Sequence, residues 1–392
     1  MYGVVSLKHS HLMTPTILIA SSIFIVATVL TIHTIYNFFA CLKPSKKHAH
    51  PDAKHGLVTI MIPARNEEKV IEKCLRSLIA QDYPELEVIV YNDQSTDQTG
   101  HIADKIAKED KRIHVIHGTH LPEGWVGKNH GCHQMSQKAQ GNWMLFGDSD
   151  IVLAPDAISR SLATADEHGL EFLSFFPRFD NYSFWERAIL PLFYFYLFAY
   201  LPMSKIMTSK NPDIVAANGS FILIKQSLYC QIGGHEAVKD KILEDVLMGR
   251  HIKGLGHKTG YGDGSELYSV HMYDTYYAIW EGFSKNAFSF FKWNYISATT
   301  YVIFAFLFLV VPFLLIPLGL LINQPLLSLA GLASSSMYLF MSAILNYRLE
   351  QGIVSVFMFP LAMFLSLAVI VNSMFRVATG KGLTWKGRSY AK

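Results

Sequence analysis

The chain has 392 residues, of which 51% are hydrophobic and only 17% are charged, so it is more apolar than a typical soluble domain. Part of it is therefore expected to lie in lipid. A formal net charge of +3 is too small for the phosphate-binding surface of a nucleic-acid-binding protein, so no nucleic-acid partner is expected. The cysteines lie far apart with no CxxC pair, which supports neither a disulfide framework nor a zinc site. They are Cys41, Cys74, Cys132 and Cys230.

The first apolar segment, Thr16 to Ala40, carries no formal charge and is long enough to cross a hydrocarbon core of about 30 Å as a helix. It ends in aromatic residues followed by Lys43, Lys46 and Lys47, whereas a signal peptide ends in a small-residue cleavage site. Residues 1–42 are predicted to be a transmembrane anchor. The lysines predict that the next domain is cytoplasmic, in a multi-pass protein of the cell membrane.

Alternating strand and helix patterns follow the anchor. This order predicts an α/β sandwich with a mostly parallel sheet, which binds its ligand at the carboxyl ends of the strands. The loops after Pro63, Asn92 and Gly147 are therefore the candidate site within a cytoplasmic domain at 43–295. The predicted strands are Leu57 to Pro63, Leu86 to Asn92, Ile113 to His117 and Asn142 to Gly147; the predicted helices are Glu67 to Gln81, Gln98 to Glu109 and one after Lys128.

The segment 188–203 is aromatic and uncharged, but it is short for a span and is interrupted by Pro191 and Pro202. It is predicted to be a helix in the membrane interface. If the segment crossed the bilayer, the acidic motifs before and after it would lie on opposite faces and would not share one site.

Three further apolar segments, 298–322, 326–345 and 353–375, predict a transmembrane region at 296–376. A basic tail follows at 377–392. Three crossings would place this tail outside the cell, whereas its positive charge places it inside. A re-entrant segment is the alternative to three full spans.

The loops after the first two strands each allow two readings. In Pro63-Ala64-Arg65-Asn66-Glu67, Asn66 is a good helix N-cap, or the loop forms one wall of a nucleotide pocket with its backbone groups and Arg65. After the second strand, Asp93 directly ends an apolar run, where a carboxylate can accept the imino N–H of a uracil. A turn with Asp97 capping the next helix explains Asp97 but not Asp93.

The pair Asp148 and Asp150 follows the strand that ends at Gly147. Two carboxylates at one strand end can share a divalent cation, whose remaining ligands are water and phosphate oxygens. Oxygen ligands suit Mg²⁺ or Mn²⁺. The alternative is a chance acidic loop.

Two helix starts carry further candidates. Lys128 follows a Gly-Trp-Val-Gly turn, where it is either a surface residue or a contact to a diphosphate beside free backbone N–H groups. Asp245, in the pair Glu244-Asp245, is either an ordinary acidic first turn or the general base that takes a proton from an acceptor hydroxyl.

The order of these motifs resembles inverting glycosyltransferase family 2, whose catalytic domain has the GT-A fold (a Rossmann-like nucleotide-diphospho-sugar transferase domain). The likeness covers about residues 57–295. It implies that Pro63, Ala64, Arg65, Glu67 and Asp93 contact the nucleotide sugar, with Asp93 at the uracil. It also implies that Asp148 binds ribose and metal, that Asp150 binds the metal, and that Asp245 is the base.

Within that family, Gly124-Trp125-Val126-Gly127-Lys128 and the anchors at both ends resemble a membrane-bound branch. This branch includes carotenoid-acid (4,4'-diaponeurosporenoate), hopanoid-associated and ceramide-type glycosyltransferases, which implies a UDP-sugar donor and a lipid acceptor. Processive polysaccharide synthases of the family carry a QxxRW motif, and this chain has none. Transfer of a single sugar, most simply glucose, is therefore expected. A cell-surface polysaccharide or polyprenyl-phosphate glycosyltransferase is the alternative enzyme.

Two other classes of protein fit the sequence less well. A transporter is disfavoured because residues 298–375 hold almost no ionisable side chain of the kind that marks a substrate path. An inactive membrane scaffold is disfavoured because all four key acids are present, namely Asp93, Asp148, Asp150 and Asp245.

Overall fold

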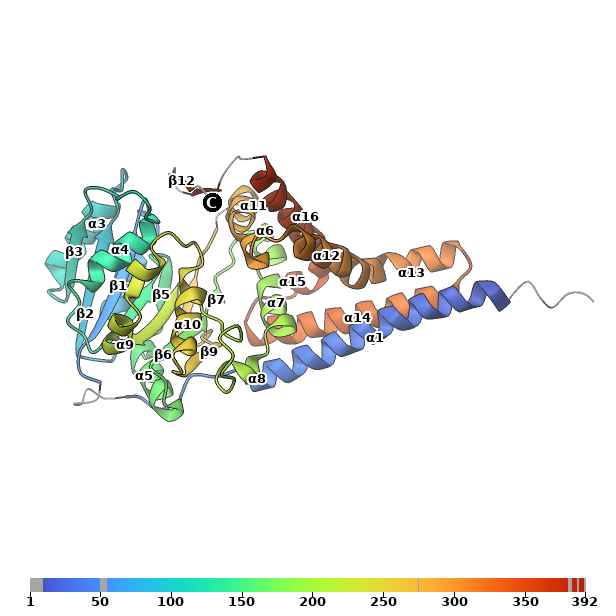
Figure 1. Cartoon of the computed structure of the whole chain (residues 1–392), viewed down its shortest axis with the longest axis horizontal. Helices are drawn as coiled ribbons and strands as arrows, with labels where there is room; N and C mark the ends of the chain where they lie inside the picture. Colours follow the sequence, from blue (N-terminus) through green and yellow to red (C-terminus); the bar gives the residue numbers. More distant parts are fainter. Residues whose placement is uncertain (1–9, 50–54, 274, 380–382, 386–387, 391–392) are drawn as a thin grey trace, which may run out of the picture. The chain divides into compact units, whose positions relative to one another are not determined.

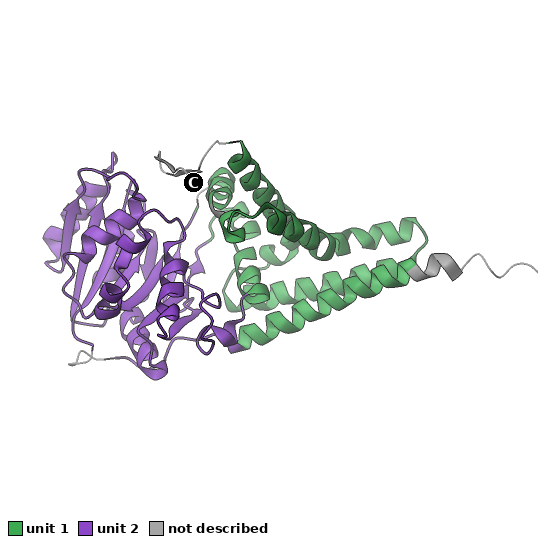
Figure 2. Ribbon diagram, in the orientation of Figure 1, with its two compact units in different colours: residues 1–39, 181–200, 273–392 green, residues 40–180, 201–272 purple. Residues whose placement is uncertain are grey.

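The computed structural model describes residues 10–49, 55–273, 275–379, 383–385 and 388–390. The chain divides into two compact units, which Figure 2 colours separately. The sheet unit comprises Ala40–Asp180 and Leu201–Met272. The helical unit comprises Met1–Phe39, Asn181–Tyr200 and Tyr273–Lys392. The domain boundaries expected after residues 42 and 295 stay predictions.

Four parallel strands form one half of the central sheet, in the order β3-β2-β1-β4 (Figure 1). The apolar runs of β1, β2 and β4 are buried, as expected for parallel strands covered on both faces, whereas β3 is buried only at Ile113. The bounds are β1 Val58–Ala64, β2 Leu86–Asn92, β3 Ile113–His117 and β4 Trp143–Gly147. All four predicted strands are confirmed, and the carboxyl ends of β2, β1 and β4 meet at one edge.

The other half of the sheet continues as β8-β6-β9, with β8 antiparallel to β4 and β6 and with β6 parallel to β9. A small second sheet has the order β5-β10-β7. These strands are β5 Ile151–Leu153, β6 Phe172–Phe176, β7 Arg178–Phe179, β8 Phe221–Lys225, β9 Thr259–Asp263 and β10 Tyr268–Val270; the main helices of this unit are α2 Ile71–Ile79, α3 Thr99–Glu109, α4 Gly127–Ser136, α5 Ala157–His168 and α10 Glu244–Gly254. The expected mixed α/β architecture with a mostly parallel sheet is confirmed.

The helical unit contains long apolar helices from both ends of the chain. Among the described residues, four segments are long and apolar enough to cross a membrane: Pro15–Ala40, Tyr295–Leu321, Pro325–Arg348 and Phe359–Ala378. They correspond to α1 (Ser10–Ala40), to α12 (Tyr295–Ala305) with a π-helical segment Phe306–Val310 and α13 (Val311–Leu321), to α14 (Pro325–Arg348), and to α16 (Phe359–Ala378). The expected apolar helices at both ends are confirmed.

Small residues let these helices approach closely. A Cβ atom on Gly331 of α14 would lie 2.6 Å from the carbonyl oxygen of Pro312, and one on Gly319 of α13 would lie 2.4 Å from Ser328 Oγ. On another face of α14, Ala330 and Leu327 form a cluster with Ala20 of α1, and the two helices run side by side (Figure 1).

The aromatic segment 188–203 forms three short helices, α6 (Phe184–Ile189), α7 (Leu192–Tyr200) and α8 (Met203–Ile206). As expected, the breaks fall at Pro191 and Pro202. Most α7 side chains are buried, and the rings of Phe195 and Phe359 lie 5.1 Å apart. The segment therefore packs on neighbouring helices, and its location in the membrane interface stays a prediction.

Candidate functional site

The loops after β1 and β2 are held together by Asn66. Its backbone N–H donates to Ser95 Oγ over 3.0 Å, and its side-chain oxygen accepts from the N–H of Thr96 over 2.8 Å. Asn66 has a φ of 53°, whereas a helix N-cap has an extended backbone. Asn66 therefore links the two loops, and its interpretation as an N-cap is wrong.

The same loops explain why α2 begins at Ile71 rather than near Glu67. The N–H of Glu67 donates to Thr99 Oγ1 over 2.7 Å, and that of Glu68 donates to Asp97 Oδ2 over 3.1 Å. These amides bind the next loop instead of starting a helix. Asp97 also accepts from the N–H of Thr99 over 3.0 Å, but the N-cap of α3 is Gln98, so the prediction that Asp97 caps this helix is wrong.

Arg65 and Asp93 lie together at these strand ends. Arg65 Nη1 donates to the carbonyl oxygen of Asp93 over 2.7 Å, and the N–H of Asp93 donates to the carbonyl oxygen of Ala64 over 2.8 Å. Asp93 is only 5% exposed. The structure thus brings Ala64, Arg65, Glu67 and Asp93 to one edge of the sheet, next to Pro63 in β1.

At the end of β4, Asp150 stands in surroundings that are rich in negative charge. Burial, followed by repulsion from Asp148 and Glu67, raises the pKa of Asp150 to about 8. Its Oδ1 atom is buried without a hydrogen-bond partner in the described part of the chain. A buried oxygen without a partner beside two further carboxylates fits a divalent cation. No group of three or more His, Cys, Asp or Glu side chains suited to a metal occurs among the described residues, so water and donor oxygens would complete the coordination.

Lys128, the second residue of α4, joins the metal candidates to the acidic start of α10. Its Nζ atom lies 2.7 Å from Asp148 Oδ1, 3.4 Å from Glu244 Oε1 and 3.2 Å from the carbonyl oxygen of Gly219. Burial alone lowers the pKa of Lys128, but Asp148 and Glu244 raise it well above its usual value. Lys128 is therefore a charged member of the site, and the surface-turn reading is wrong for it.

Asp245 lies in the first turn of α10, where its Oδ1 atom accepts from the N–H of Val246 over 2.8 Å. Burial and then the negative charge of Glu244 raise the pKa of Asp245 to about 7, against the opposing effect of Lys128. A carboxylate that titrates near neutral pH is suited to general base catalysis.

Sequence reasoning missed two members of this cluster. The sequence gives Glu244 no role beyond its place next to Asp245, because its burial is visible only in the structure. Gly219 gave no signal in the sequence. A Cβ atom at Gly219 would lie 2.8 Å from Lys128 Nζ, 3.3 Å from Glu244 Oε1 and 3.6 Å from Asp245 Oδ2, so a larger residue would displace the Lys128 ammonium from its present position.

The site as a whole combines an acidic pair, Asp148 and Asp150, with the ammonium of Lys128 and the candidate base Asp245. Residues 59–233 match the family model described as Glycosyl transferase family 2. This part of the chain is therefore similar to a family 2 glycosyltransferase domain. This match covers the β1, β2 and β4 loops, Lys128 and Gly219.

Two curated proteins that this chain resembles are 4,4'-diaponeurosporenoate glycosyltransferases of Staphylococcus aureus, from strains USA300 and MRSA252. They are 30% identical to this chain over 239 and 241 residues, respectively, and each alignment covers 59% of this chain and 61% of the relative. The chain thus matches about three fifths of the length of these curated relatives.

The fold has a counterpart among solved structures. A mannosyltransferase from Pyrobaculum calidifontis, in complex with GDP-Man and Mn²⁺, matches with a TM-score of 0.52 and 16% sequence identity, over 93% of this chain and 99% of that chain. The expected GT-A fold is confirmed.

Proposed function

We propose that this protein is a membrane-bound inverting glycosyltransferase that moves a single sugar from a UDP-sugar to a lipid. The contact that supports this function best is the chain of charges Asp148, Lys128 and Glu244 beside Asp245. It puts the donor end and the acceptor end of a transfer reaction within reach of one ammonium group.

The donor is proposed to bind at the ends of β1, β2 and β4. In the likeness to the family, Pro63, Ala64, Arg65 and Glu67 contact the nucleotide and Asp93 accepts from the uracil. The hydrogen bond from Arg65 to the backbone of Asp93 orders both residues before the donor arrives, which lowers the entropic cost of binding. UDP-glucose is the first donor to test.

Asp148 and Asp150 are proposed to hold Mg²⁺ or Mn²⁺, which when bound stabilises the negative charge of the leaving diphosphate. Asp148 is shared with Lys128 over 2.7 Å. Lys128 is therefore proposed to contact the diphosphate as a second positive charge beside the metal site.

Asp245 is proposed to take the proton from an acceptor hydroxyl, which then attacks the anomeric carbon from the face opposite the leaving group. The name of the S. aureus relatives suggests a carotenoid acid as acceptor; hopanoids, glycerolipids and sphingolipids are the other candidates. The lysines at 43, 46 and 47 favour a cytoplasmic catalytic domain on the cell membrane.

Two asparagine variants distinguish a carboxylate acceptor from a hydroxyl acceptor. A carboxylic acid with a pKa near 4 is already ionised at neutral pH and needs no base. With a carotenoid acid, Asp245→Asn is expected to slow transfer less than Asp150→Asn does, as measured by steady-state rates at pH 7. Equal and complete loss in both variants would exclude a carboxylate acceptor.

The function itself is tested with detergent-purified protein, UDP-glucose, Mn²⁺ and extracted membrane lipid. UDP release and lipid glycosylation are measured for the wild type and for Asp150→Ala. Metal-dependent release that is lost in the variant supports the proposal. No release from any nucleotide sugar, with lipid supplied, would contradict it.

A further inference from the structure

In the helical unit, α6 and α11 (Tyr276–Asn286) pack side by side and carry exposed aromatic side chains. The rings of Trp185 and Tyr276 lie 4.9 Å apart, Phe184 is 52% exposed, and Tyr277 is 71% exposed. Tyrosine and tryptophan concentrate where a membrane meets water. We call α6 and α11 together the aromatic layer.

The segment 354–378, which contains α16, contacts the aromatic layer at both of its ends. Before α16, Ser355 Oγ donates to the carbonyl oxygen of Arg187 in α6 over 2.7 Å. At the other end of α16, Arg376 forms an ion pair with Glu281 in α11. Both ends of the segment therefore contact the same layer, although α16 is long and apolar enough to span a membrane.

α16 runs antiparallel to α12. Near the layer, Tyr295 Oη donates to the carbonyl oxygen of Met374 over 3.4 Å. Away from the layer, the ring of Phe359 lies 6.3 Å from that of Phe313 and 6.1 Å from that of Tyr338. Tyr338 is in the middle of α14, so the first turn of α16 lies level with the middle of a candidate span.

A groove of about 480 Å³ lies between the two helices. Its α16 wall is formed by positions three or four residues apart, which lie on one face of a helix over about 16 Å. They are Phe364, Leu367, Ala368, Val371, Asn372 and Phe375. The opposite wall contains Val302 of α12 and Phe306 of the π-helical segment.

Most of the groove is apolar, and only its end near the aromatic layer is polar. Asn372, the polar residue of the lining, lies 2.9 Å from Ser284 Oγ in α11, and the Arg376–Glu281 ion pair follows one turn later. At the other end, Phe364 and Phe306 are 52% and 37% exposed. Because both walls belong to candidate membrane helices, the groove is expected to face lipid rather than water.

We propose that this groove binds the long apolar chain of an amphipathic lipid, whose polar head lies at Asn372 and Arg376. The inference rests on the proposed function in one respect, namely that this lipid is the sugar acceptor. The groove volume of about 480 Å³ favours a single lipid chain. A helix of another protein, about 10 Å wide and 16 Å long, would need about 1,200 Å³.

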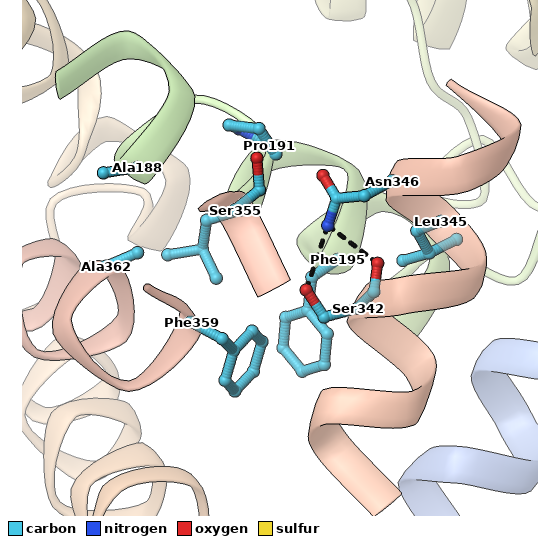
Figure 3. Close-up of a pocket in the computed structure, with 10 residues that line it drawn as sticks. Ala188, Pro191, Phe195, Ser342, Leu345, Asn346, Ser355, Phe359 and Ala362 are labelled. Atoms are coloured by element: carbon cyan, nitrogen blue, oxygen red, sulfur yellow. Dashed lines mark hydrogen bonds between the residues drawn. The ribbon is translucent and has the colours of Figure 1, made fainter. Parts of the chain in front are cut away.

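A second cavity in the helical unit is too small for this role. Figure 3 shows it between α6, α7, α14, α15 (Val354–Phe357) and the start of α16, where Asn346 donates to the carbonyl oxygen of Ser342 over 2.7 Å. Its volume is about 10 Å³, which is room for one water molecule. The lipid chain is therefore assigned to the α12–α16 groove.

The test uses the full-length protein in detergent and two photoreactive, clickable C16 fatty acids, one with the diazirine near the carboxylate and one with it near the tail. Cross-linked peptides of the wild type are mapped by mass spectrometry. The head probe is expected to label near Asn372 and the tail probe near Phe364. Label spread over other helices, or the same positions for both probes, would overturn the proposal.

Variants give the second arm of the test. Ala368→Trp fills the groove and is expected to reduce cross-linking about tenfold, as a loss of about 1.4 kcal/mol would. The matched control is Leu361→Trp, an exposed position on the same helix outside the lining, which is expected to label like the wild type. If Ala368→Trp has a lower unfolding temperature than the control, it is replaced by Val371→Phe, which is a smaller change.

Donor hydrolysis separates this inference from the proposed function. The rate of UDP release without lipid is expected to be unchanged in Ala368→Trp, while the KM for the lipid acceptor rises about tenfold. If cross-linking and the KM of Ala368→Trp are unchanged and hydrolysis is normal, the groove does not bind the lipid, but the proposed function is supported. If cross-linking is specific but no hydrolysis occurs, the groove binds lipid, but the proposed function is contradicted.

Discussion

Lys128 links the candidate metal-binding acids to the acidic start of α10. Its ammonium contacts Asp148, Glu244 and the backbone of Gly219, and these contacts are lost if the ammonium is removed. The acids would then repel one another without a fixed positive charge among them.

Substitution of Lys128 is expected to reduce kcat strongly. We expect Lys128→Met to lower kcat about 100-fold, the usual effect of removing one preorganised group that stabilises charge in the transition state. Lys108→Ala, on the exposed face of α3, is the control and is expected to keep the wild-type rate. A Lys128→Met rate within threefold of the wild type would contradict the role.

The pKa of Asp245 predicts the pH dependence of transfer to a hydroxyl acceptor. Because the ionised form acts as base and the pKa is about 7, the rate is expected to rise tenfold per pH unit below 7 and then level off. Glu244→Gln removes the negative charge that raises this pKa, so the acidic limb is expected to move to lower pH. The check is the pH profile of kcat/KM for both proteins; an unmoved limb would contradict the assignment.

At the scale of the element, the contact between α13 and α14 depends on glycine. Gly331→Val is expected to destabilise the helical unit by about 1–3 kcal/mol, because a Cβ atom there would lie 2.6 Å from the backbone of Pro312. Ser336→Val, on an exposed position of the same helix, is expected to have little effect. Thermal unfolding in one detergent compares the two variants.

The sequence predicted the elements that depend on local patterns. β2 has the predicted bounds, and its apolar run is buried throughout; β3 also has the predicted bounds, although only Ile113 of this strand is buried. The start of α2 was wrong because the amides of Glu67 and Glu68 bind side chains some 30 residues later, and no local pattern reports such a contact. Gly219 could not be predicted for the same reason, because the residues near it, Lys128, Glu244 and Asp245, are distant in the sequence.

At the scale of the whole molecule, α16 decides on which side of the membrane the basic tail lies. With both ends of its segment on the aromatic layer, α16 is expected not to cross. α1, the α12–α13 segment and α14 would then be the three spans, and the tail would lie on the same side as α11. This result agrees with the positive charge of the tail.

Single-cysteine variants in a background without native cysteines test this topology. Asn323, between α13 and α14, and Thr379, after α16, are both exposed. We expect Asn323→Cys to react with a membrane-impermeant maleimide in intact cells, and Thr379→Cys to react only after permeabilisation. Labelling of both variants in intact cells would mean that α16 crosses the membrane.

The packing of α1 on α14 also has a consequence for biosynthesis. Ala20 forms a cluster with Leu327 and Ala330, which the ribosome adds about 300 residues later. At 5–20 residues per second, that interval is about 15–60 s. If α1 spans the membrane, it is there without its partner while the whole sheet unit is synthesised, so the anchor has to be stable as a single helix before it becomes part of a bundle.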